Sequence, residues 1–446
     1  MNTPIILKNG TLVNEGKSES ADVYLKNGRI EKIAASISAG GTDRVIDCSG
    51  LHILPGIVDD QVHFREPGLT HKGNIFSESR AAVAGGVTSY MEMPNTKPTT
   101  TTAAELMNKL NMAKGRSWAN YAFFFGVTND NTEEVLNVDI SQTCGIKIFM
   151  GSSTGNMLVD SPGILERIFG GTPLTIATHC EDERTILANL EKAKARYGNA
   201  IPISEHPVIR SREACFLSSS FAISLARKYG TNLHVLHLTT AEELMQFEPG
   251  PMKGKKITAE VCVHHLWFDD SDYARLGSLI KCNPAIKTRN DKEALWKALL
   301  EDRIDIIATD HAPHTMEEKN REYPESPAGL PLVQHGLAMM LTAVNEKKIS
   351  LEKIVDKMCH RPADRFELAE RGYLREGYHA DIAVANLSMQ HVVEEEDVLY
   401  HCGWTPLKGQ NLFGKNVFTF VNGHLVYDHG KILGEPLGAQ ITFNRS

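Results

Sequence analysis

Polar side chains alternate along residues 59–65, at the start of the segment DDQVHFREPG. If this segment is a strand, Asp59, Gln61, His63 and Arg65 share one face, because successive side chains of a strand point to opposite sides. An amide, an imidazole and a guanidinium would then lie together. Such a face could bind a metal ion and hold a substrate, and the glutamine among these groups needs an explanation.

Four more polar residues each follow an apolar run: Lys147, His179, His237 and Asp310. A single histidine at the end of a strand is more often a hydrogen-bonded structural residue than a ligand. Together with His63, however, these residues would end five strands of one barrel. Imidazoles and a carboxylate form a donor set that zinc accepts, with one position left open for water. We therefore predict a zinc-type centre.

Lys147 does not fit this centre as an ordinary lysine, because an ammonium group would repel a divalent cation. If burial lowers its pKa, the free amine can add CO₂ and become a carbamate, an anionic ligand able to bridge two metals. The alternative is a lysine that pairs with an acid or extends to solvent. The segment GIKIFM alone favours that alternative, and the neighbouring candidate ligands would have to overturn it.

The elements that must position these residues follow a regular alternation. Apolar segments with the composition of buried strands alternate with helical stretches such as residues 77–86 and 291–302. Repeated strand and helix units with continuously apolar strands predict a (β/α)8 TIM barrel, whose active site lies at the carboxyl ends of the strands. The expected strands are residues 56–64, 86–95, 120–128, 144–150, 173–181, 232–238, 256–266 and 305–314.

Both ends of the chain have the sequence pattern of short strands joined by Asn-Gly turns. The dipeptides at residues 9–10, 27–28 and 422–423 are strong hairpin signals. Hairpins this short need partners to bury one face, so we expect the two ends to pair with each other. The predicted organisation is a small β-sandwich module made of residues 1–55 and 366–446, with the barrel at residues 56–365.

Composition and charge argue against several other classes of protein. The chain has 446 residues, with 55 acidic against 47 basic residues and a formal charge of −8, so nucleic acid is not an expected partner. No apolar run approaches the roughly 18 residues of a membrane span, and no signal peptide is evident. The eight cysteines form no C-x-x-C pair, which favours reduced, buried thiols. We expect a soluble cytoplasmic protein without a membrane partner.

Longer motifs make a family recognisable. The segments DDQVHFREPG, MPNTKP (93–98), GIKIFMGSSTG (145–155), ATHCED (177–182), TAEVCVHHL (258–266) and ATDHAPHTMEEK (308–319) resemble the dihydroorotases of the amidohydrolase superfamily. The resemblance covers nearly the whole chain. It implies a metal-bound hydroxide in a (β/α)8 barrel and the reversible cyclisation of N-carbamoyl-L-aspartate to (S)-dihydroorotate, a step of pyrimidine (UMP) synthesis. It also implies a small-molecule substrate and a homodimer.

The resemblance assigns the metal centre and the proton transfer. Attack on an unactivated amide needs a nucleophile made from water near neutral pH, and zinc lowers the pKa of bound water to about 7. Asp310 would be the catalytic general acid and base, taking a proton from the nucleophile and giving it to the departing ring nitrogen. The metal ligands implied by the resemblance are His63, Lys147 as its N6-carboxylated form, His179, His237 and Asp310.

The resemblance also assigns the substrate contacts. The α-carboxylate of the substrate would be held by Arg65, Asn95 and His314, beside His63, because a planar guanidinium suits a carboxylate. The ring amide would contact Asn283, and backbone groups of Ala328 and Gly329 in PAGLP (327–331) would close over the ring. Asn95 and Asn283 could alternatively be ordinary loop residues.

Three further histidines are predicted to be structural. His264 and His265 belong to an HHL element that does not ligate metals in the resembling enzymes. His234 lies three residues before His237, so strand alternation predicts that it points to the opposite face and packs toward the helices.

Gln61 departs from the resembling pattern, in which the first strand reads H-x-H and both imidazoles bind the more buried metal. A neutral amide oxygen is a weaker zinc donor than imidazole. We therefore predict two unequal zinc sites. One zinc is held tightly by His179, His237 and the Lys147 carbamate, and the second is held more weakly, through Gln61 or a water in its place.

Two alternative functions remain open at this point. Allantoinase and hydantoinase relatives share the barrel and the modified lysine, but their substrates lack a ring carboxylate, so Arg65, Asn95 and His314 favour a dihydroorotase. A non-catalytic scaffold for a partner such as a transcarbamoylase subunit should have lost several ligands, whereas here only position 61 is altered.

Overall fold

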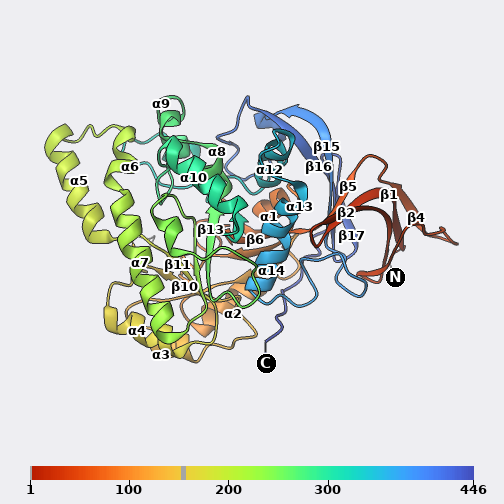
Figure 1. Ribbon diagram of the computed structural model, residues 1–446, viewed down its shortest axis with the longest axis horizontal. Coiled ribbons are helices and arrows are strands. Elements are labelled where there is room, and N and C mark those ends of the chain that lie inside the picture. Colours follow the sequence, from red (N-terminus) through yellow and green to blue (C-terminus); the bar gives the residue numbers. More distant parts are fainter. Residues whose placement is uncertain (1–2, 152–156, 446) are drawn as a thin grey trace.

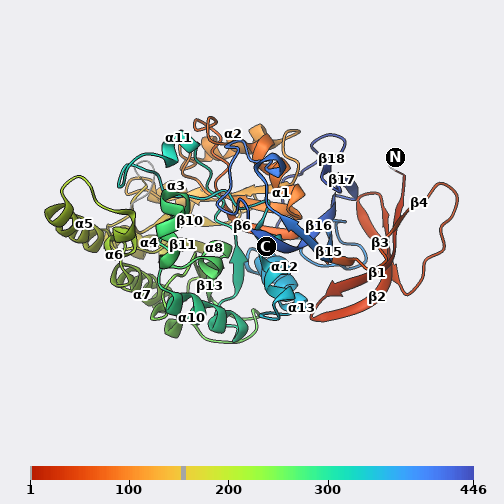
Figure 2. The same cartoon turned by 90° about the horizontal axis from the view of Figure 1, so that it is seen from above.

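The computed structural model describes residues 3–151 and 157–445. A barrel surrounded by helices fills most of the molecule, and a module of strands lies at one end of its long axis, as both views show (Figure 1, Figure 2). Residues 152–155, which end the GIKIFMGSSTG segment, lie outside the described residues, as do residues 1, 2 and 446 of the predicted β-module.

The barrel strands are short, parallel and almost entirely buried, as expected for strands that are covered by helices on one side and packed in the lumen on the other. They form two sheets, in the orders β14-β13-β12-β11-β10-β9 and β6-β7-β8. The bounds are β6 (Ile57–Val62), β7 (Val87–Glu92), β8 (Asn120–Phe123), β9 (Phe125–Gly126), β10 (Ile146–Phe149), β11 (Ile176–His179), β12 (Leu233–Val235), β13 (Ile257–Cys262) and β14 (Ile306–Ala308).

The two sheets close into one barrel. Only Phe124 separates β8 from β9, so the chain itself carries one sheet into the other. At the second seam, Val62 forms a parallel bridge with His311, and the His63 amide donates to the His311 carbonyl at 2.7 Å. The predicted (β/α)8 barrel is confirmed, with β8 and β9 together serving as its third strand.

Helices surround the barrel, and their ends follow ordinary capping rules. In α7 (Arg212–Tyr229), the Ser211 side chain accepts from the Ala214 amide, and Gly230 ends the helix in the left-handed region. The other longer helices are α1 (Ile75–Ala84), α2 (Ala103–Ala113), α4 (Pro162–Gly171), α5 (Glu183–Tyr197), α10 (Arg289–Leu300) and α12 (Gly336–Asn345).

Short helical turns complete the loops. The α-helical ones are α3 (Thr132–Leu136), α6 (His206–Ile209), α8 (Val263–Trp267), α9 (Tyr273–Leu276), α11 (Met316–Lys319), α13 (Leu351–Val355) and α14 (Arg361–Arg365). The others are η1 (Ile203–Glu205), η2 (Glu243–Gln246), η3 (Asp270–Asp272), η4 (Gly277–Ile280), η6 (Glu395–Asp397) and the π-helical η5 (Asp356–His360).

Strands from both ends of the chain form one sheet, as predicted, in the order β18-β17-β16-β15-β5-β1-β2-β3, with β4 paired to β1. The ends meet where β15 runs antiparallel to β5, with Ile382 opposite Pro55. The module has its own core, which includes Leu7, Val23 and Phe420. Its strands are β1 (Ile5–Asn14), β2 (Lys17–Lys26), β3 (Arg29–Ala34), β4 (Arg44–Asp47), β5 (His52–Pro55), β15 (Ile382–Val392), β16 (Asn411–Val421), β17 (His424–Asp428) and β18 (Lys431–Ile432).

Two of the three predicted Asn-Gly turns are confirmed. Residues 27–28 join β2 to β3, and residues 422–423 join β16 to β17, both with positive φ. The turn predicted at residues 9–10 is wrong: β1 continues through it with a bulge and turns at residues 15–16. The backbone N–H of Asn9 donates to the Asp22 side chain, and Ile53 lies so close to Gly10 that an added Cβ would be only 2.5 Å from it. Contacts to other strands therefore determine this bulge.

Several further observations bear on the predicted organisation. The chain after β18 returns to the barrel, where Tyr121 bridges Gln440 and Ile441 packs among buried barrel residues. The domain boundaries at residues 55/56 and 365/366 stay predictions. All eight cysteines are free, and all but the half-buried Cys402 are buried. Among the described helices, none is both long enough and apolar enough to cross a membrane.

Candidate active site

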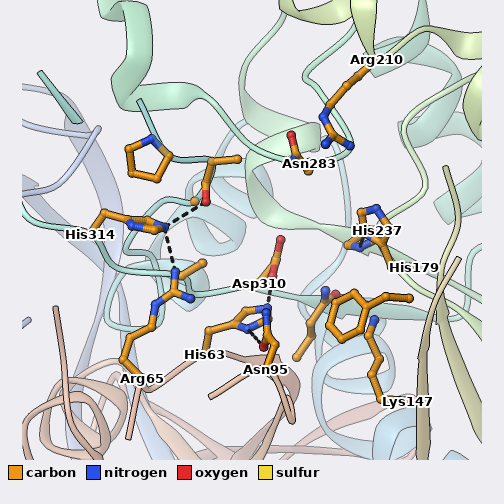
Figure 3. Close-up of a pocket in the computed structure, with 16 residues that line it drawn as sticks. His63, Arg65, Asn95, Lys147, His179, Arg210, His237, Asn283, Asp310 and His314 are labelled. Atoms are coloured by element: carbon orange, nitrogen blue, oxygen red, sulfur yellow. Dashed lines mark hydrogen bonds and ion pairs between the residues drawn. The ribbon is translucent and has the colours of Figure 1, made fainter. Parts of the chain in front are cut away.

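A cavity of about 350 Å³ opens at the carboxyl ends of the barrel strands (Figure 3). The twelve residues that the sequence analysis assigned to the site all line it. Their chemical roles stay predictions, but the structure brings them together. The lining consists of Gln61, His63, Arg65, Asn95, Lys147, His179, His237, Asn283, Asp310, His314, Ala328 and Gly329, together with Phe149, Arg210, Ala312 and Pro327.

The strands place the ionisable groups near or just beyond their carboxyl ends. Lys147 lies within β10, and His179 is the last residue of β11. His237 and Asp310 each follow their strand by two residues, and His63 directly follows β6. Five different strands therefore converge on one cavity, which no local segment could build alone.

The imidazoles and the carboxylate lie in two close pairs. His179 Nδ1 is 3.0 Å from His237 Nε2, and His63 Nε2 is 3.2 Å from Asp310 Oδ1. His237 Nδ1 is buried without a hydrogen-bond partner among the described residues. Nitrogen and oxygen atoms gathered in this way around a cavity fit a zinc-type centre.

Neighbouring side chains orient these histidines. His63 Nδ1 lies 2.8 Å from Asn95 Oδ1, which can only accept, so Nδ1 donates to it, and Nε2 faces Asp310 Oδ1 at 3.2 Å. His179 Nε2 lies 3.0 Å from Glu181 Oε2. A carboxylate or amide on the second ring nitrogen is typical of metal-binding histidines. The sequence analysis gave Asn95 only a substrate contact, so its position behind His63 is a finding of the structure.

Lys147 has the environment that carbamate formation needs. Its side chain is almost fully buried, and its Nζ lies 4.5 Å from the centre of the Phe149 ring. Nζ makes no hydrogen bond or ion pair with the described residues. Burial lowers the pKa of Lys147 to about 7, so much of the amine is neutral near physiological pH. A neutral amine is the form that adds CO₂.

The charged Arg65 and the neighbouring His314 form one wall of the cavity, opposite His179, His237 and Lys147 (Figure 3). Arg65 Nη2 lies 2.9 Å from His314 Nε2, and Nε donates to the Pro313 carbonyl at 3.0 Å. Burial lowers the pKa of Arg65 to about 10, which leaves it charged at neutral pH. A fixed guanidinium here suits a carboxylate.

Asn283 offers an unused acceptor. Its Oδ1 is buried and has no hydrogen-bond partner among the described residues. A buried acceptor without a donor costs about 1–3 kcal/mol, which a ligand N–H would recover. This position agrees with the predicted contact to a ring amide.

Three lining residues other than glycine are held in left-handed backbone conformations. The φ values are 71° at Arg65, 40° at His237 and 45° at Asp310. Such conformations are unfavourable for non-glycine residues and concentrate at functional sites. The backbone thus turns these side chains toward the cavity after their strands have ended.

The sequence analysis missed Arg210, which follows α6 and reaches the cavity from the side of Asn283 (Figure 3). Arg210 Nη1 donates to Glu181, whose other neighbour is His179. Burial alone would raise the pKa of Glu181, but Arg210 and then His179 lower it to about 2. Glu181 is therefore a carboxylate that orients His179. The only sequence signal was the position of Glu181 two residues after His179.

Among the histidines predicted to be structural, His264 and His265 are buried and do not line the cavity. The prediction for His234 is wrong. Its Nε2 lies 3.2 Å from Asp60 on β6, which is not adjacent to β12 in the sheet, so His234 points into the lumen and not toward the helices. The reason is that β12 ends at Val235, so strand alternation does not relate residue 234 to residue 237.

Comparisons with known proteins agree with this geometry. Residues 52–426 match the model of the amidohydrolase family. This chain belongs to that family. It is 30% identical to a dihydroorotase of Methanosphaera stadtmanae, over 95% of this chain and 96% of the relative, and 30% identical to an allantoinase of Desulfitobacterium hafniense, over 98% of both.

Among solved structures, the L-hydantoinase of Arthrobacter aurescens superposes with a TM-score of 0.93 at 28% identity, covering 98% of this chain and 99% of that one. The resemblance stated from the motifs is thereby confirmed. The chain is an amidohydrolase-family hydrolase of cyclic amides.

Proposed function

We propose that this enzyme is a dihydroorotase, which interconverts N-carbamoyl-L-aspartate and (S)-dihydroorotate in pyrimidine synthesis. The observation that carries the proposal is the buried guanidinium of Arg65 beside His314, across the cavity from the histidine pair. Dihydroorotate carries a ring carboxylate that this wall can bind, whereas allantoin and hydantoin do not. The matches to dihydroorotases support the same choice.

The residues that would hold zinc are His63, Lys147 as its carbamate, His179, His237 and Asp310, with Gln61 as a weaker contributor. The buried nitrogen and oxygen donors and the depressed pKa of Lys147 fit this assignment. Zinc at this position would supply a water molecule that is deprotonated near neutral pH. One tight and one weaker zinc remain the prediction, because Gln61 Oε1 accepts a contact from Cys262 Sγ at 3.7 Å and is a poor replacement for imidazole.

The other residues of the site bind the substrate, cover its ring and transfer the proton. Arg65 and His314 bind the carboxylate and fix the ring. Asn283 accepts a hydrogen bond from a ring N–H, and the backbone at Ala328 and Gly329 covers the ring and excludes water. The carboxylate of Asp310 takes the proton of the attacking water and delivers it to the ring nitrogen that leaves.

The pKa of Asp310 suits this proton transfer. Burial alone would raise it, but the hydrogen bond from His63 lowers it, so the group starts as a base. In the direction of ring closure, the same carboxyl group takes the proton from the nitrogen that joins the ring and gives it to the departing water.

Turnover by the purified, zinc-loaded protein tests the assignment. Loss of dihydroorotate absorbance would be followed beside hydrolysis of allantoin and hydantoin under the same conditions. We expect dihydroorotate to have the highest kcat/KM. Faster turnover of allantoin or hydantoin would refute the substrate, and no turnover of any of the three by metal-filled protein would favour the non-catalytic scaffold. The cytoplasmic location and the homodimer stay predictions.

A further inference from the structure

A second group of metal-type ligands lies inside the barrel lumen, outside the cavity lining. Asp60, His234 and Glu260 come from β6, β12 and β13, and all three are completely buried. His234 Nε2 is 3.2 Å from Asp60 Oδ2 and 3.4 Å from Glu260 Oε2. One ligand atom from each residue lies within 4.8 Å of the other two.

This group is unusual for a barrel lumen, which is normally filled with branched apolar side chains. Two carboxyl groups are buried here, and among the described lysines and arginines none forms an ion pair with either. Glu260 Oε1 accepts from the His237 amide at 3.1 Å. Neither oxygen of Asp60, in contrast, accepts a hydrogen bond from any described residue. A buried carboxylate without a partner is strongly unfavourable, so a cation is expected beside it.

The hydrogen bonds of His234 determine which nitrogen faces the carboxylates. Its Nδ1 lies 2.8 Å from Thr258 Oγ1, and the Thr258 hydroxyl donates to the Leu233 carbonyl at 3.2 Å. Because that hydroxyl proton is already used, Thr258 Oγ1 accepts from His234 Nδ1–H. In the neutral imidazole, the lone pair of Nε2 therefore faces the oxygens of Asp60 and Glu260. This is the arrangement of a metal-binding histidine with its second nitrogen fixed.

Three electron-pair donors that face one another require a positive charge between them. A divalent cation between them would neutralise both carboxylates. Ligand atoms around a tetrahedral ion with bonds of 2.0–2.1 Å are about 3.3–3.4 Å apart. The two distances from His234 Nε2, 3.2 and 3.4 Å, match that spacing.

We propose that Asp60, His234 and Glu260 bind a divalent transition-metal ion, with Zn²⁺ as the fitting example, in the lumen beneath the catalytic cavity. Asp60 Oδ1 also lacks a partner and can complete the coordination. The ion ties β6 to β12 and β13 on the other side of the lumen. It braces β6, which carries Gln61, from below, and it is distinct from the metals of the cavity.

Crystals of the full chain, expressed in medium supplemented with Zn²⁺, test the proposal by anomalous scattering at the zinc edge. We expect a peak between Asp60, His234 and Glu260, separate from any peak beside His179 and His237. Zinc-filled cavity sites with no peak in the lumen would overturn the proposal and leave a shared proton as the cation. This measurement needs no variant, so it stands even if a substitution prevents folding.

Zinc content in solution provides the second test. The variant Asp60→Asn keeps the size of the side chain and removes its charge, and it should lose about one zinc per chain after dialysis, with a lower Tm. The matched control is Asp59→Asn, because Asp59 is an adjacent buried carboxyl that instead accepts from Thr309. The control should keep the wild-type zinc content. Equal zinc content in wild type and folded Asp60→Asn would also overturn the proposal.

Discussion

Replacing Arg65 with methionine tests the proposed hold on the substrate carboxylate. The Arg65 side chain is only 5% exposed, and Nε and Nη2 are fixed by Pro313 and His314, so the group meets a ligand with little reorganisation. A charge-assisted hydrogen bond contributes about 1.5–3 kcal/mol. Since about 1.4 kcal/mol corresponds to a factor of ten, kcat/KM for dihydroorotate should fall about 10- to 150-fold.

The assay follows dihydroorotate absorbance, with the zinc content of each sample measured in parallel. Zinc content should not change, because Arg65 is not a predicted ligand. The variant Lys72→Met is a matched control. Lys72 Nζ lies 3.1 Å from His314 Nδ1 and 3.0 Å from Glu318, but it does not line the cavity. Removing this charge should lower kcat/KM less than about fivefold.

A comparison of two substrates tests whether Arg65 acts by binding the ring carboxylate. Any slow hydrolysis of hydantoin, which has no ring carboxylate, should be unaffected by Arg65→Met. If kcat/KM for dihydroorotate does not change, Arg65 does not hold the substrate. If the variant loses both activities equally, Arg65 acts through the structure of the site and the carboxylate argument fails.

Three further predictions address the metal centre and stability. Lys147→Ala should lose zinc and activity, and short carboxylic acids should partly restore both. In wild type, burial lowers the pKa of Lys147 to about 7, so reconstitution of the apoenzyme with zinc and bicarbonate should become faster as the pH rises through 7. A rate of reconstitution that does not change with pH would contradict the carbamate. Gln61→His should keep the second zinc through mild chelation that removes it from wild type; two equally tight zincs in both proteins would contradict the weakening role of glutamine. Burial alone would raise the pKa of Asp302, but Lys353 and Lys357 lower it to about 2, below the unfolded value of about 3.9, so its stabilisation is complete above pH 4 and is lost as the pH falls toward 2. Asp302→Asn should therefore reduce the free energy of unfolding by roughly 1 kcal/mol at pH 7, since solvent screens this partly exposed group, and by much less at pH 2, as measured by urea denaturation; an equal reduction at both values would show that the ionised carboxylate is not the cause.

Local sequence patterns were sufficient for the barrel strands and for the residues at their carboxyl ends. An apolar run fixes a buried strand, and in a parallel barrel every strand ends on the same face. Lys147, His179, His237 and Asp310 could therefore be assigned to one site from their positions after such runs. The Asn-Gly turns at residues 27–28 and 422–423 were equally local, because the positive φ values belong to the two turn residues themselves.

The same local signals fail where distant contacts decide. Asn9-Gly10 has the sequence of a turn, but Asp22 and Ile53 hold it as a bulge within β1. Arg210 lies between two helices and carries no local mark of a functional residue, and only the packing of α6 brings it to the cavity beside Glu181.

Residues 60–61 and His234 show most clearly which features the sequence determines and which ones depend on the tertiary structure. The sequence by itself determined that an acid and a glutamine stand next to each other near the end of the first barrel strand, because residue identity is a local property. Only the tertiary structure decided that β12 ends at Val235 and that His234 crosses the lumen to meet Asp60 and Glu260. The physical reason is that closure of the barrel brings together side chains from strands that are far apart in the chain and not neighbours in the sheet, and no periodicity within one segment encodes that contact.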